Sequence, residues 1–132
     1  MKAGTIDDVN LEKKEIVVNW RYDGNNEMKG IIPGGTAVIL KANEGNYKLK
    51  LLPENDDESP KDNLLHGSDI RALTTGGEIF YKLSYGLLDN IEIKDKLGWY
   101  YGASEREAFE IEDHKAWLAL NKNQAISEIF FI

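Results

Sequence analysis

His66-Gly67-Ser68-Asp69 is the shortest stretch of this chain that holds the residue types of a catalytic site. A histidine base, a serine hydroxyl and an aspartate are the groups that a serine triad requires. Adjacent positions rarely point at one another, however, because triad members normally converge from distant segments. The chain has only two histidines, the second being His114 in an expected surface turn, and it has no cysteine nucleophile. An enzyme centred on His66 is therefore the third of three functional hypotheses, and we favour a binding protein over an enzyme.

Oxygen-rich side chains gather in the acidic stretch at residues 54–62. Their carboxylates and amides are ligands of the kind that calcium takes. The stretch lacks the spacing and the central glycine of an EF-hand loop, and a run of charge is usually a solvated loop. Zinc is less expected still, because the chain offers no cysteine and no paired histidines. The sequence predicts no metal site and no cofactor, with calcium binding by this loop left as an alternative.

An aromatic cluster occupies residues 98–102. On an extended backbone Trp99 and Tyr101 share one face, and exposed rings of this kind form a platform for a sugar ring. The opposing interpretation is that they fill the core, which is the commoner fate of large aromatic side chains and is expected for Trp20 and Trp117. Glycan binding is our second hypothesis, and its predicted contacts are Trp99, Tyr101, Asp23, Asn25 and Asn26.

Acidity is the strongest global property of the chain, whose net charge is −7. An acidic surface repels phosphate backbones and attracts basic proteins, so nucleic-acid binding is not expected. By analogy of charge and size alone, inhibitors and immunity proteins dock on basic surfaces in this way. Our first hypothesis is a non-enzymatic binding domain that engages a protein partner. The residues predicted to contact this partner are Asp56, Asp57, Glu58, Asp62, Glu105 and Glu107.

The early acidic residues Asp7 and Asp8 precede any apolar run of signal-peptide length. No segment approaches the roughly 18 apolar residues of a membrane helix. We therefore expect a cytoplasmic protein that does not contact membranes, with unconventional secretion as the alternative. The absence of cysteine fits a reducing compartment.

Short strands must position all of these groups, because apolar and polar residues alternate along most of the chain between Gly, Asn and Asp clusters. The clearest example places Ile79, Tyr81 and Leu83 on one face. Further strand candidates are residues 16–22, 28–32, 36–42, 47–52, 69–73, 90–94, 98–102 and 125–132. The last of these is so apolar on both faces that it should be an internal strand.

Three hairpins are expected from the turn residues. Asp23-Gly24 would join 16–22 to 28–32, and residues 43–46 would join 36–42 to 47–52. The third would turn at residues 112–114. Its alternative is one short helix between Ser104 and Asn121, since Ser104 and Glu107 form a capping box.

The fold prediction is a single all-β domain over residues 1–132. At this length one self-sufficient core is feasible. The expected architecture is an antiparallel β-sandwich or barrel of about nine to eleven strands.

Overall fold

The computed structural model describes residues 1–24, 30–52, 58–84 and 96–132. Over these residues the chain is nearly all β, with ten strands and a single 3₁₀ turn, which confirms the predicted fold class. The strands are β1 (Lys2–Asn10), β2 (Glu15–Asp23), β3 (Ile39–Lys41), β4 (Leu65–Ser68), β5 (Ala72–Leu73), β6 (Ile79–Ser84), β7 (Gly98–Tyr101), β8 (Glu110–Ile111), β9 (Lys115–Leu120) and β10 (Ile129–Phe131). The 3₁₀ turn η1 (Ser104–Arg106) is the only helical element described, and no helix there is long and apolar enough to cross a membrane.

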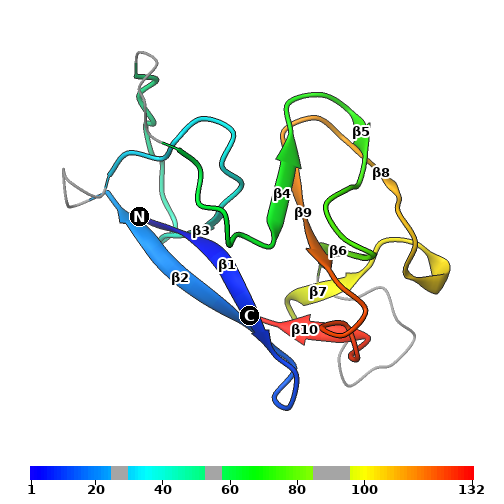
Figure 1. The fold of residues 1–132 in the computed structure, drawn as a ribbon. Helices are drawn as coiled ribbons and strands as arrows, with labels where there is room; N and C mark the ends of the chain where they lie inside the picture. The colour runs from blue at the N-terminus through cyan, green and yellow to red at the C-terminus, as the bar shows by residue number, and fades with distance from the viewer. Residues whose placement is uncertain (25–29, 53–57, 85–95) are drawn as a thin grey trace.

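Eight of the strands form one curled sheet in the order β3-β1-β2-β10-β7-β6-β9-β4 (Figure 1). The two ends of this sheet meet at Leu64. Its N–H donates to the carbonyl of Ile6 in β1 at 2.7 Å, and its carbonyl accepts from the N–H of Ala119 in β9 at 3.1 Å. The sheet is therefore a partly closed barrel over the described residues.

The C-terminal strand β10 lies inside this sheet, between β2 and β7, as its apolar sequence predicts. Its pairing with β2 is an exception within the predicted antiparallel fold. Phe131 pairs with Glu15 in parallel orientation, and the N–H of Phe131 donates to the carbonyl of Lys14 at 2.7 Å. The other strand pairs in the described residues are antiparallel.

Apolar side chains fill both faces of the strands near β6. Ile79 and Tyr81 belong to the main cluster inside the barrel, and Phe80 packs outside it with Trp117 and Ala119. Half-buried apolar side chains, including that of Phe109, pack against this outer cluster. The prediction of one buried face on β6 was therefore incomplete. It was also wrong for Leu83, which is exposed.

The first hairpin of the chain differs from the predicted one. β2 turns back on β1, an N-terminal strand that the pattern did not reveal, through residues 11–14 with Lys14 at φ 55°. β1 escaped recognition because it holds Gly4 and adjacent polar residues. A Cβ at Gly4 would lie 2.8 Å from the carbonyl oxygen of Asn19, so the close approach of β2 requires glycine there. Of the expected return strand 28–32, residues 30–32 are not a strand, and 28–29 lie outside the described residues.

β8 and β9 correct the predicted third hairpin. The turn at residues 112–114 is present, with His114 at φ 58°, but the two strands do not pair with each other. β8 pairs with β5, and β9 pairs with β4 and β6. Residues 65–73 thus run antiparallel to 110–118 as one ribbon in constant register, with a bend in the middle. The bend falls within 69–73, so that predicted strand is reduced to β5.

Residues 47–52 are the largest departure from the predicted strands. They are not a strand in the structure, and the second predicted hairpin is absent, leaving only β3 from its first half. The predicted strand 90–94 lies outside the described residues.

Candidate functional site

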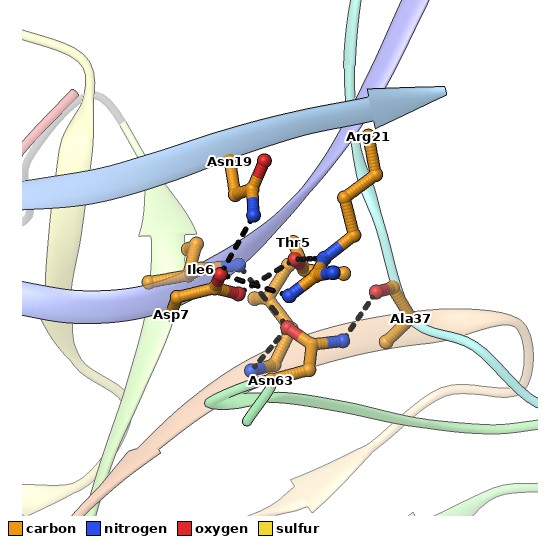
Figure 2. Close-up of polar contacts among 8 residues, drawn as sticks. Thr5, Ile6, Asp7, Asn19, Arg21, Ala37 and Asn63 are labelled. Carbon is orange, nitrogen blue, oxygen red and sulfur yellow. Dashed lines mark hydrogen bonds and ion pairs between the residues drawn. The ribbon is translucent and has the colours of Figure 1, made fainter. Parts of the chain in front are cut away.

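A network of charged and amide side chains joins β1 and β2 (Figure 2). Asp7 accepts hydrogen bonds from Thr5 at 2.7 Å and from Asn19 at 2.9 Å, and pairs with Arg21 at 2.9 Å. The Nε of Arg21 also donates to the hydroxyl oxygen of Thr5 at 2.8 Å. Burial acts to raise the pKa of Asp7, but these hydrogen bonds and the charge of Arg21 outweigh it, so the pKa is lowered.

Asn63 lies beside this network and holds three segments together (Figure 2). Its Oδ1 accepts from the N–H groups of Ile6 and Leu65 at 3.1 and 3.2 Å, and its Nδ2 donates to the carbonyl of Ala37 at 2.7 Å. Its polar atoms are thus occupied with backbone groups of the fold, and we assign Asn63 a structural role. Neither group is evident in the sequence, because these positions become neighbours only when the strands pair.

His66 lies in β4 and is half-buried. Its ring stacks on Trp117, with centroids 6.2 Å apart and planes at 20°. Burial lowers the pKa of His66. The two other triad residue types in this stretch point elsewhere: the hydroxyl of Ser68 accepts from the N–H of Ile70 at 3.2 Å, and Asp69 lies 3.7 Å from His114. In the contacts of the described residues, His66 therefore has an aromatic neighbour and no carboxylate to orient it as a base.

A hollow of about 240 Å³ borders His66. Thr36, Ser59, Lys61 and Asn63 are among the residues that line it. The hydroxyls of Thr36 and Ser59 are 2.8 Å apart and hydrogen-bond each other. Thr36, Ser59 and Asn63 therefore already form hydrogen bonds with other parts of the chain.

Trp99 lies in the core and is only 2% exposed, so it offers no face to a sugar ring. Tyr101 is half-buried, and the guanidinium of Arg106 lies 5.0 Å from its ring centroid. The aromatic platform on which the glycan hypothesis depends is not formed by these two residues. Trp20 departs from prediction in the opposite direction: it is 38% exposed, with the ammonium of Lys41 5.9 Å from its ring centroid.

The remaining glycan candidates are Asp23, Asn25 and Asn26. Asp23 ends β2, half-buried and paired in register with Lys2. Asn25 and Asn26 lie outside the described residues.

The acidic candidates fall into two separate groups. Glu58 and Asp62 are exposed in the segment that leads to β4, while Glu105 and Glu107 are exposed in and after η1. Figure 1 shows these segments on opposite sides of the molecule. Asp56 and Asp57 lie outside the described residues. Glu58 and Asp62 thus do not converge with Glu105 and Glu107 into a single patch.

One of these groups continues into a larger acidic surface along β8 and the bend of the ribbon. We define this acidic surface as the exposed carboxylates of Asp69, Glu105, Glu107, Glu110, Glu112 and Asp113. Arg71 pairs with Glu110 at 2.7 Å, but both side chains are exposed, and pairs of this kind contribute little. Besides Arg71, the exposed Lys115 follows the bend, so the six carboxylates outnumber the exposed cations among them.

Arg106 is the only cation in the sequence from 105 to 113. Glu105 and Arg106 both adopt positive φ, at 59° and 71°, a rare conformation outside glycine that turns the chain sharply. After this turn the guanidinium of Arg106 lies over Tyr101 and donates to the carbonyl of Ala125 at 3.1 Å. The backbone at η1 thus directs the positive group into the fold and leaves the neighbouring carboxylates facing water.

The described residues hold no group of three or more His, Asp or Glu side chains arranged to bind a metal ion. No protein-family model, curated protein or solved structure matches the chain.

Proposed function

We propose that this protein is a binding domain whose acidic surface engages a basic protein partner. The observation that supports it best is the segregation of charge at η1. Arg106 is turned onto Tyr101, and the carboxylates around it are exposed. A surface of one sign steers an oppositely charged partner toward it and raises the association rate.

The pairing of backbone groups along the ribbon also supports this function. Most of the carboxylates are carried by two paired strands and the bend between them, and the N–H of His114 donates to the carbonyl of Ser68 at 2.8 Å within that bend. Charges on a fixed backbone need little ordering when a partner binds, and this lowers the entropic cost of association.

The test compares two double variants, each of which reverses two charges and changes the net charge by the same amount. Glu107→Lys/Glu112→Lys changes the acidic surface, and Glu12→Lys/Glu15→Lys changes exposed positions at the other hairpin. All four side chains are exposed, so both variants should fold. Each protein is immobilised and used to capture partners from the native source at low salt, and association rates are then measured for any captured protein.

We expect the wild type and the control to retain the same partner, with association slowing as salt rises. The variant of the acidic surface should associate at least about tenfold more slowly, because steering can raise on-rates by factors of 10 or more. Equal rates for all three proteins, or a capture that is insensitive to salt, would contradict the proposed function.

A further inference from the structure

A histidine lies inside the acidic surface. His114 occupies the turn between β8 and β9, and its side chain is exposed. Two carboxylates of the acidic surface flank it, that of Asp113 in the same turn and that of Asp69 just after β4. Histidine is the side chain whose charge ordinarily changes between pH 5 and 8. His114 is the single histidine among residues 104–115, so it is the group there that can switch charge near neutrality.

Each ring nitrogen of His114 faces one of the two carboxylates. Its Nδ1 lies 3.7 Å from Oδ1 of Asp69, and its Nε2 lies 3.6 Å from Oδ2 of Asp113. A neutral imidazole carries one N–H, so its other nitrogen presents a lone pair to an anionic oxygen. The imidazolium carries an N–H on both nitrogens and attracts both carboxylates. The arrangement of the two carboxylates is therefore matched to the charged ring.

The backbone of the ribbon brings these three side chains together. His114 adopts φ 58°, and its N–H donates to the carbonyl of Ser68 at 2.8 Å. Ser68 ends β4, where it is paired with Lys115 of β9, and Asp69 follows it directly. Asp69 and Asp113 are far apart in the sequence. They reach the same ring because β4 pairs with β9 and the chain turns at residues 112–114.

Other charged side chains close to His114 in the ribbon are of types that keep their charge near neutrality. Lys115 follows His114 and is exposed, as is Glu112 on the other side of the turn. Arg71, in the bend, pairs with Glu110 at 2.7 Å. Lysine, arginine and carboxylate side chains ordinarily titrate well outside the range from about pH 5.5 to about pH 8. A change of charge in this part of the surface over that range therefore comes from His114.

This change acts on the surface potential more than on stability. His114, Asp69 and Asp113 are all exposed, and exposed ion pairs contribute little to folding. The rate at which a basic partner is steered to the surface depends instead on the sum of its charges. A positive ring between two carboxylates reduces that sum where the negative charge is concentrated.

We propose that His114 makes binding at the acidic surface dependent on pH. When the ring takes up a proton, it places a positive charge between Asp69 and Asp113, and a basic partner associates more slowly. The proton and the partner thus compete for the same carboxylates, so binding is favoured above neutrality and weakened at mildly acidic pH. The inference rests on the proposed function, because a basic partner is what responds to this charge.

The test uses a fluorescently labelled octalysine peptide as a basic probe of defined composition. Lysine stays charged throughout the range from about pH 5.5 to about pH 8, so the probe itself does not change. Its association rate is measured by stopped flow at low salt at both ends of this range. We expect the rate for the wild type to fall by about twofold or more at the acidic end, since a single charge a few Å from the contact alters the attraction by this order.

Two substitutions of His114 fix the charge of this position. Asparagine tolerates positive φ, and Lys14 adopts φ 55° elsewhere in this chain, so His114→Asn and His114→Lys should both fold. His114→Asn should associate at the faster rate at both pH values, and His114→Lys at the slower rate at both. His66→Gln is the matched control, because it removes the other histidine from outside the acidic surface and should keep the pH dependence of the wild type. Circular dichroism verifies that the variants are folded.

The outcomes separate this inference from the proposed function. If Glu107→Lys/Glu112→Lys slows association with octalysine but the wild type and His114→Asn respond equally to pH, the role of His114 is wrong and the acidic surface still steers its partner. If the double reversal does not change the rate, the surface does not steer basic partners, and both proposals fail. A fall in rate that is present in the wild type and absent from His114→Asn would support the inference.

Discussion

Trp99 is held in the core by packing and not by a hydrogen bond. Its indole N–H has no hydrogen-bond partner among the described residues. It is 2% exposed within the main core cluster. An unpaired buried donor costs about 1 to 3 kcal/mol, so the benefit of this side chain comes from its apolar surface. The residue is therefore part of the fold and not a ligand contact.

Trp99→Ala is expected to lower the free energy of unfolding by about 3 to 5 kcal/mol through lost burial and the cavity that remains. Trp99→Phe should cost clearly less, since it keeps an aromatic ring and removes the unpaired N–H. Chemical denaturation of both variants gives the two values. Trp20→Ala, at a partly exposed position, is the control and should cost much less than Trp99→Ala. Similar losses at the two tryptophans would contradict the assignment of Trp99 to the core.

His66 makes stability depend on pH near neutrality. Burial lowers its pKa in the folded state below the ordinary value of 6.5. Between the lowered pKa and 6.5 the unfolded chain binds more protons than the folded chain, so stability rises with pH. The contribution of His66 is therefore fully present above about pH 6.5 and declines as the pH falls through this window.

The measurement is the free energy of unfolding from urea titrations at several pH values from about 5 to 8. The wild type should lose stability toward the acidic end, and His66→Gln should show a flatter profile over the same window. His114→Gln is the control, since His114 is exposed. Parallel profiles for wild type and His66→Gln would show that His66 does not supply this dependence.

The barrel is closed by residues 63–64, just before β4, and not by a long pair of strands. Leu64 joins β9 to β1 through its backbone, and Asn63 binds the N–H of Ile6 beside it. The same amide reaches the carbonyl of Ala37, just ahead of β3. These two residues connect the start of the sheet to its end.

Asn63→Ala should destabilise the fold by about 1 to 3 kcal/mol, since it leaves the buried N–H of Ile6 without this acceptor. Denaturant unfolding measures the loss, and hydrogen exchange should show reduced protection of the amides of Ile6 and Leu65. Asn123→Ala, at an exposed position after β9, is the matched control and should change stability by no more than about 0.5 kcal/mol. Unchanged exchange at Ile6 in the Asn63 variant would contradict the closure.

At the scale of the whole molecule, the acidic surface that we propose for binding follows η1, β8 and the ribbon bend (Figure 1). The control reversals at Glu12 and Glu15 lie at the hairpin of β1 and β2, outside this surface. Loss of binding confined to the Glu107 and Glu112 variant would therefore assign the partner to this part of the molecule.

The sequence by itself determined the secondary structure where alternation was strong and the turn residues were clear. β6, β7, β9 and the internal β10 were all predicted as strands, because aromatic and branched apolar residues are concentrated between clear turn residues there. Acidity and the absence of cysteine were likewise visible without coordinates. The strand β1 was missed because close approach to β2 requires Gly4, and glycine weakens a strand pattern.

Only the tertiary structure decided which strands pair and which side chains face water. The pairing of β8 with β5, the parallel contact of β10 with β2 and the burial of Trp99 depend on segments far apart in the chain. The acidity of residues 105–113 is visible in the sequence. The position of the Arg106 guanidinium over the ring of Tyr101 is not. Alternation says that a segment has two faces. It does not say which strand will lie beside it, because the partner is selected by register and packing across the whole fold.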